Sequence, residues 1–84
     1  MGYSIKIKAS AQKALSQLSK PERLRVIQAI DRLRDQPLAG GTLKGEFSGL
    51  RRLRVGRFRI VYEVVHEELT ILVVRVADRR EAYR

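Results

Sequence analysis

The stretch LRRLRVGRFRIVYEVV, residues 50–65, decides the fold of this chain. Apolar and polar side chains alternate on both sides of Gly56, which is typical of two half-buried strands joined by a tight turn. If Gly56 and Arg57 form a type II′ turn, Leu53 lies opposite Ile60 on one apolar face. The sequence therefore predicts a hairpin with one buried face and one polar face.

The polar face of this hairpin is basic. The same register places Arg54 directly opposite Arg59, with Arg52 one step along the strand. Like charges that face each other across a ladder are unfavourable, by a fraction of the roughly 0.2–1 kcal/mol that such pairs are worth. From the hairpin alone two interpretations stay open: the arginines bind an anion, or they lie apart on a solvated face.

The composition of the chain also favours an anionic partner. Its 84 residues, expected to form one domain over 1–84, include 18 Lys and Arg against 9 Asp and Glu, for a net charge of +9. Nucleic acid, an acidic protein and a membrane surface all fit this charge. Cysteine is absent, and no apolar run approaches the roughly 18 residues of a membrane span or the core of a signal peptide. We expect a soluble, cytoplasmic protein with no membrane partner.

The first third of the chain predicts a strand and a helical hairpin. Residues 3–8 alternate between apolar and polar side chains, which indicates a short strand. Ser10 is expected to cap a helix that runs through Leu18, and Ser19 with Glu22 forms a capping box for a second helix that ends before Pro37. The apolar stripes of the two helices comprise Ala11, Ala14, Leu15 and Leu18, and Val26, Ile27, Ile30 and Leu33.

The rest of the chain completes an α+β fold. Residues 37–49 hold four glycines and are expected to be a connection without an element of its own. Residues 69–76, LTILVVRV, are apolar on both parities until Arg75, which suits an interior strand. The expected order is β-α-α-β-β-β, a twisted, mainly antiparallel sheet with the helical hairpin packed on one face. The expected core comprises Ile5, Ile7, Leu15, Ile27, Ile30, Leu53, Phe58, Ile60, Tyr62, Leu72 and Val74.

Few residues that could perform chemistry are present. His66 is the one histidine, in an expected turn, and it has no Cys or His partner at ligand spacing, so neither a metal nor a cofactor is expected. The serines lack a base in a recognisable motif, and GTLKGEF lacks the ending of a phosphate-binding loop. Arginine, lysine and tyrosine remain. They suit cleavage of RNA, in which the neighbouring 2′-hydroxyl attacks and the protein only holds the phosphate, stabilises its charge and moves protons.

Two motifs resemble the RelE/ParE superfamily of bacterial and archaeal toxin–antitoxin systems. The pattern R-x-G-x-[YF]-R-[IV]-[IVL]-Y occurs over residues 54–62, and RREAY follows over residues 79–83. RelE-like members are ribosome-dependent endoribonucleases that cut mRNA without a metal, and an antitoxin silences each of them. The resemblance extends over essentially the whole chain and implies the same element order.

The resemblance also implies site residues. In the RelE pattern two lysines alternate before the turn, and an arginine follows the turn. This chain has Arg52 and Arg54 at the lysine positions, then Arg59, with Arg79 and Tyr83 near the end, and all five are expected to be catalytic. Arginine carries protons much less well than lysine, which puts a general base on that strand in doubt. The further residues expected to contact RNA are Lys44, Arg51, Arg57, Arg75 and Arg80.

The resemblance implies partners and leaves alternatives open. The expected partners are the ribosome, mRNA and a cognate RelB-like antitoxin with an acidic binding segment, which would form a toxin–antitoxin hetero-oligomer. A ParE-type toxin that inhibits DNA gyrase is the main alternative, because ParE-like members share the fold but generally lack the RelE catalytic side chains. A degenerate member that only binds RNA or antitoxin is the third.

Overall fold

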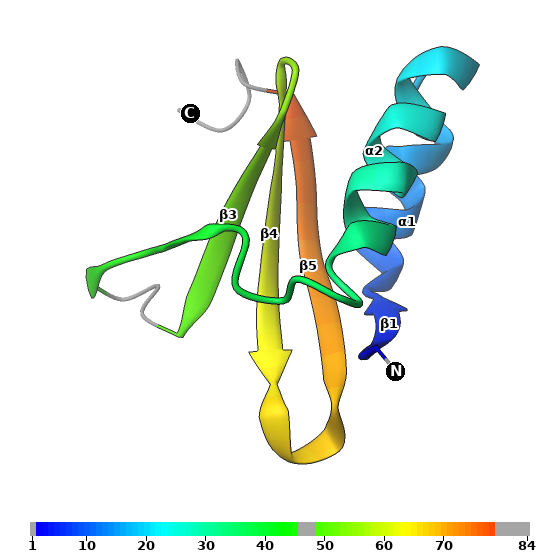
Figure 1. Ribbon diagram of the computed structural model, residues 1–84. Coiled ribbons are helices and arrows are strands. Elements are labelled where there is room, and N and C mark those ends of the chain that lie inside the picture. Colours follow the sequence, from blue (N-terminus) through cyan, green and yellow to red (C-terminus); the bar gives the residue numbers. More distant parts are fainter. Residues whose placement is uncertain (1, 46–48, 79–84) are drawn as a thin grey trace.

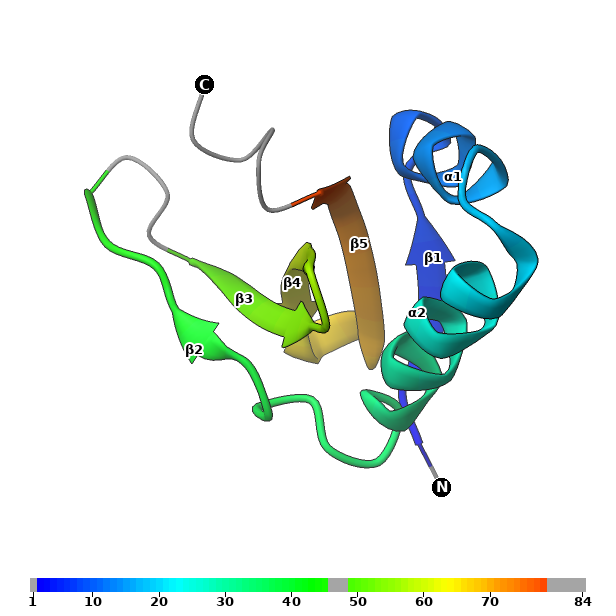
Figure 2. The same ribbon diagram turned by 90° about the horizontal axis from the view of Figure 1, so that it is seen from above.

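The computed structural model describes residues 2–45 and 49–78, which form a twisted sheet with both helices on one side (Figures 1 and 2). The elements follow the order β1 (Ser4–Ile7), α1 (Ala9–Ser16), α2 (Lys20–Arg32), β2 (Gly41–Thr42), β3 (Leu50–Val55), β4 (Phe58–Val65), the 3-10 helix η2 (His66–Glu68) and β5 (Thr70–Asp78). Within this described part, no helix has the length and apolar character needed to cross a membrane.

The sheet has five strands in the order β1-β5-β4-β3-β2. β1 pairs in parallel with β5, and every other neighbouring pair is antiparallel. This confirms the α+β class and the mainly antiparallel sheet. The two-residue strand β2 corrects the expectation that residues 37–49 contain no element, because Gly41 and Thr42 pair with Arg52 and Arg51 of β3.

The β3–β4 hairpin has the predicted register. Leu53 lies opposite Ile60, and Arg54 lies opposite Arg59. Gly56 has a φ of +57°, the left-handed conformation that the first position of a type II′ turn requires. Ile60 is fully buried and Leu53 packs against the core, so the apolar face of the hairpin points toward the helices as predicted.

The core lies between the helices and this face of the sheet. Its buried residues are Ala11, Leu15, Val26, Ile30, Leu33, Phe58, Ile60, Tyr62, Ile71, Val73 and Val76. The predicted core positions Leu15, Ile30, Phe58, Ile60 and Tyr62 are therefore confirmed. Ile5, Ile7 and Leu53 are partly buried and pack against the same cluster.

The prediction of which β5 side chains face the core was wrong. Ile71 and Val73 are fully buried, whereas Leu72 and Val74 are only half-buried on the opposite face. The register shifts between Val61, which pairs with Arg75, and Tyr62, which pairs with Val73, so Val74 is the extra residue of a bulge. A strand that is apolar on both parities contains no alternation from which its inward face could be predicted.

The helices differ from prediction at their margins. Ser19 caps α2 as predicted, since its hydroxyl accepts a hydrogen bond from the Glu22 backbone N–H at 3.4 Å and donates one to the Glu22 carboxylate at 3.0 Å. The predicted Ser10 cap is wrong, because α1 begins at Ala9 and its N-cap Lys8 makes no capping bond. Ile27 is 42% exposed and not in the core. It lies about 100° around the helix from buried Val26, at the edge of the apolar stripe.

Tyr62 fixes the segment that leads from α2 into β2. Its side chain is fully buried, and its hydroxyl accepts a hydrogen bond from the Gly40 N–H and donates one to the Pro37 carbonyl, both at 2.9 Å. A Cβ at Gly40 would lie 2.7 Å from the Arg52 carbonyl oxygen. The backbone at residue 40 therefore approaches β3 so closely that only glycine fits there. This contact sets the path by which the chain crosses to the far edge of the sheet.

We expect Tyr62→Phe to lower the free energy of unfolding by about 1–3 kcal/mol, because it leaves the buried Gly40 N–H without its acceptor. Urea denaturation measures this loss. The matched control is Tyr3→Phe, which removes an exposed 3.0 Å hydrogen bond to His66 Nδ1 and should change stability by less than about 0.5 kcal/mol. Equal losses in the two variants would contradict the role given to Tyr62.

Candidate functional site

The face of the sheet opposite the helices carries a hollow of about 440 Å³, which we call the basic hollow. It is lined by Lys8, Leu43, Leu50, Arg52, Arg59, Val61, Val74, Arg75 and Ala77. Four of these side chains are basic and none is acidic. The alternation that turns Phe58 and Ile60 toward the helices turns Arg59 into this hollow, so the site is a direct consequence of the hairpin register.

Arg59 lies at the centre of the basic hollow. It is on β4, with Arg54 directly opposite on β3 and Ala77 directly opposite on β5. Arg59 is only 7% exposed, so neighbouring atoms restrict its rotamers, whereas Arg54 is exposed. The hairpin therefore presents a buried cation on β4 with an exposed cation across from it on β3.

Two further arginines flank an apolar floor. Arg52 and Arg75 lie on either side of Val61, on strands about 10 Å apart. Leu43, Leu50 and other apolar residues line the same hollow. Guanidinium groups bind phosphate oxygens in pairs of hydrogen bonds, and an apolar floor accommodates a sugar or a base. The hollow can therefore bind a ligand that is anionic at one end and apolar at the other, as a nucleotide is.

Two predicted RNA contacts point elsewhere. Arg51 has the opposite parity to Arg52, and its guanidinium donates hydrogen bonds to the carbonyls of Gly40 at 2.6 Å and Leu38 at 3.5 Å. Lys44 is exposed beyond β2 and does not line the basic hollow. Arg51 therefore holds the same connection, residues 37–40, that Tyr62 fixes. A count of basic residues cannot distinguish such a structural arginine from one that binds a ligand.

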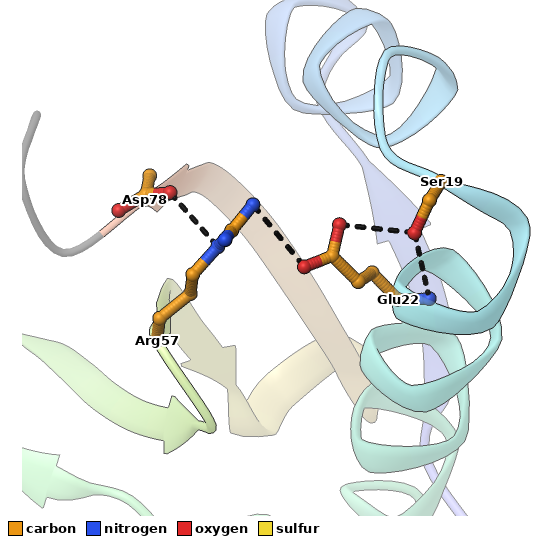
Figure 3. Close-up of polar contacts among 4 residues, drawn as sticks. All are labelled: Ser19, Glu22, Arg57 and Asp78. Carbon is orange, nitrogen blue, oxygen red and sulfur yellow. Dashed lines mark hydrogen bonds and ion pairs between the residues drawn. The ribbon is translucent and has the colours of Figure 1, made fainter.

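Arg57 also has a structural role (Figure 3). Its guanidinium bridges two carboxylates, with Nη2 3.2 Å from Glu22 Oε2 and Nε 3.0 Å from Asp78 Oδ2, and it lies 5.1 Å from the centre of the Phe58 ring. Glu22 is also the partner of Ser19 in the capping box. The tip of the β3–β4 hairpin is thus tied to the start of α2 and to the end of β5, and the charge of Arg57 is compensated.

The remaining predicted residues Arg79, Arg80 and Tyr83 lie outside the described residues. They follow directly after Asp78, whose carboxylate is held by Arg57. Lys8 is the residue that sequence reasoning missed. Lys8 directly follows β1, and it lines the basic hollow because β1 pairs with β5. The alternation of residues 3–8 gives no information about which strand lies next to β1.

Other chemistry has little support among residues 2–45 and 49–78. No group of three or more His, Asp or Glu side chains there could hold a metal ion. His66 follows the far end of β4 from Arg59, roughly 20 Å along the strand, and its ring contacts Tyr3. Ser19 caps α2, and the Ser16 hydroxyl donates to the Lys13 carbonyl at 2.7 Å. The basic side chains are therefore the main candidates for ligand binding on the described surface.

The different surroundings of Arg57 and Arg54 predict different effects on stability when each loses its charge. Arg57→Gln should lower the free energy of unfolding by about 1 kcal/mol, because two partly exposed ion pairs are lost. Arg54→Gln removes the same charge three residues away and should leave stability unchanged or raise it, since it relieves repulsion with Arg59. Urea denaturation at low and high salt measures both, and both effects should shrink as salt screens the charges. Arg54→Gln being as destabilising as Arg57→Gln would contradict this assignment.

Known proteins share both the sequence pattern and the fold. The chain is 29% identical over 86 residues to Toxin RelG of Mycobacterium tuberculosis, across 100% of this chain and 99% of the relative. The RelBE2 toxin–antitoxin complex from the same organism contains a chain with a TM-score of 0.87 and 26% identity, covering 94% of this chain and 100% of that one. The archaeal RelE–RelB complex from Pyrococcus horikoshii gives a TM-score of 0.78 and 27% identity, covering 94% and 97%.

A family model describes almost the entire chain. Residues 5–83 match the model of the ParE toxin of the type II toxin–antitoxin system parDE. The matched range contains the hairpin, the basic hollow and both motifs. The chain therefore belongs to the ParE toxin family, within the RelE/ParE superfamily of type II toxin–antitoxin toxins.

Proposed function

We propose that this toxin is a metal-independent endoribonuclease that cuts mRNA on the ribosome and so inhibits translation. The observation that carries the proposal is the basic hollow, which Lys8, Arg52, Arg59 and Arg75 line without a carboxylate among the described residues, with Arg54 as the cross-strand neighbour of Arg59. A fold-only role gives no reason to place like charges opposite one another. An anionic phosphodiester bound in the hollow would reduce the repulsion among these cations.

In the proposed reaction the RNA supplies its own nucleophile. The 2′-oxygen attacks the adjacent phosphorus, the bond from phosphorus to the 5′-oxygen breaks, and a 2′,3′-cyclic phosphate and a 5′-hydroxyl result. Negative charge grows on the phosphoryl oxygens as the attack proceeds, and Arg59 and Arg54 stabilise it. Arg52 and Arg75 hold the flanking chain, so that the 2′-oxygen stays aligned with the bond that breaks.

Two protons must also move, one from the 2′-hydroxyl and one to the 5′-oxygen. Arginine, with a pKa above about 12, holds its proton and is therefore a charge donor in this scheme. Arg79 is proposed as a further charge donor, and Tyr83 as a ring that stacks on a base and orients it. Both assignments rest on the RREAY motif.

We propose a RelB-like antitoxin as the silencing partner. The solved relatives from M. tuberculosis and P. horikoshii are complexes of a RelE-type toxin with its antitoxin. An acidic antitoxin segment that covers or displaces ligands from the basic hollow would inhibit this chain in a hetero-oligomer. Such charge complementarity makes association fast and sensitive to salt.

Inhibition of DNA gyrase is the second candidate function. Its support is that the matching family model is that of a ParE toxin and that arginines stand where the RelE pattern has lysines. A supercoiling assay with purified gyrase separates the two functions. Inhibition of gyrase without cleavage of mRNA would overturn the ribonuclease proposal.

We expect induction of the toxin to produce discrete breaks in translated mRNA, mapped by primer extension, and untranslated copies of the same transcript to stay intact. In single-turnover cleavage on programmed ribosomes, Arg59→Gln should lower the rate by about 10²–10³, because one preorganised charge donor is lost. Arg57→Gln is the matched control, since its charge is already paired with Glu22 and Asp78.

The control variant should retain nearly the wild-type rate per folded molecule. An Arg59→Gln rate equal to wild type would remove Arg59 from the mechanism. Cleavage of untranslated RNA at the same sites would remove the ribosome from it.

A further inference from the structure

A second hollow, of about 280 Å³, lies between α2 and β3 and contains three arginines. Arg25 and Arg32 come from α2, and Arg54 comes from β3. We call this hollow the arginine groove. The amides of Gln28 and Gln36 also line it, and none of the carboxylates in the described part of the chain does.

The secondary structure explains why these side chains converge. Arg25 and Arg32 are seven residues apart, so they lie on the same face of α2 about 10 Å from each other along its axis. On the other wall, β2 pairs with β3 only at Arg51 and Arg52. The last three residues of β3, 53–55, pair with β4 along one edge, and along the other edge they face α2 across the groove instead of β2.

Within residues 2–45 and 49–78, no ion pair compensates the charges of the arginine groove. In the described part of the chain, ion pairs engage Arg34 with Asp31 and Arg57 with its two carboxylates, whereas Arg25, Arg32 and Arg54 take part in none. Three such cations around one hollow repel one another and favour an anion. The glutamine amides add donors and acceptors that bind sugar and base atoms.

The arginine groove adjoins the basic hollow through Arg54. This residue lines the groove and is also the cross-strand neighbour of Arg59, which lines the hollow on the other side of β3. A single strand that crosses β3 would contact both sites without a break. An acidic peptide could satisfy the charge, but the junction at Arg54 favours a continuous polyanion.

We propose that the arginine groove binds the phosphodiester backbone of single-stranded RNA next to the segment held in the basic hollow. The inference rests on the proposed function in taking RNA as the ligand. It assigns Arg25 and Arg32 to phosphate contacts remote from the bond that breaks. They contribute to holding RNA and leave the rate of the bound complex unchanged.

The test compares Arg25→Gln/Arg32→Gln with Lys13→Gln/Lys20→Gln, two variants that lose the same charge at exposed helical positions. The probe is a short fluorescein-labelled 2′-O-methyl RNA, which lacks the attacking hydroxyl, titrated by fluorescence anisotropy at several KCl concentrations. Each phosphate contact contributes about 0.7 to the slope of log K against log salt for single strands. The groove variant should therefore show a slope shallower by roughly 1.4, and the lysine variant a much smaller change.

The outcomes separate this inference from the proposed function. A slope unchanged in the groove variant, or equally reduced in the lysine variant, would overturn the groove as an RNA site. Loss of binding to polyglutamate with RNA binding unchanged would overturn it in favour of an acidic protein ligand. If the wild-type toxin fails to cut mRNA on ribosomes while the slope difference stands, the ribonuclease proposal fails and the RNA site remains. If cleavage occurs, the groove variant at saturating toxin should keep the wild-type single-turnover rate.

Discussion

The pairing of β3 with β4 is the constraint on which the rest of the structure depends. With Leu53 opposite Ile60 facing the helices, Arg59 turns into the basic hollow on the other side, and its cross-strand neighbour Arg54 lies exposed beside the arginine groove. Because side chains alternate with period two, a slip of one residue would bury the arginines and expose the apolar pairs. The same register therefore determines the core and the basic hollow, and a change that disturbs one disturbs the other.

The molecule tolerates its concentrated positive charge because other contacts hold the hairpin in place. Arg57 connects the hairpin tip to Glu22 and Asp78, and Tyr62 with Arg51 holds the connection beside β3. These contacts lie on the helix side or at the tip, away from the basic hollow. Among the described basic residues, Arg51 and Arg57 therefore hold the fold through local contacts, and Arg52 and Arg75 line the basic hollow.

Much of this arrangement could be predicted from local sequence patterns. Alternation around Gly56 gave the hairpin register and placed Arg52 and Arg59 on one face, and the Ser19 capping box gave the start of α2. Local patterns could not give the bulge at Val74, since that strand is apolar on both parities. They also could not show that Lys8 lines the basic hollow or that Arg57 is compensated, because both depend on residues that are distant in sequence.

We propose that the helix-free face of the sheet binds RNA. Titration of ¹⁵N-labelled toxin with a 2′-O-methyl RNA, followed by NMR of backbone amides and arginine Nε–H groups, tests it residue by residue. We expect the signals of Arg59 and Arg75 to shift as the RNA is added, while those of the exposed α1 residues Gln12 and Lys13 stay in place. Shifts confined to the outer surface of the helices, with Arg59 and Arg75 unchanged, would contradict it.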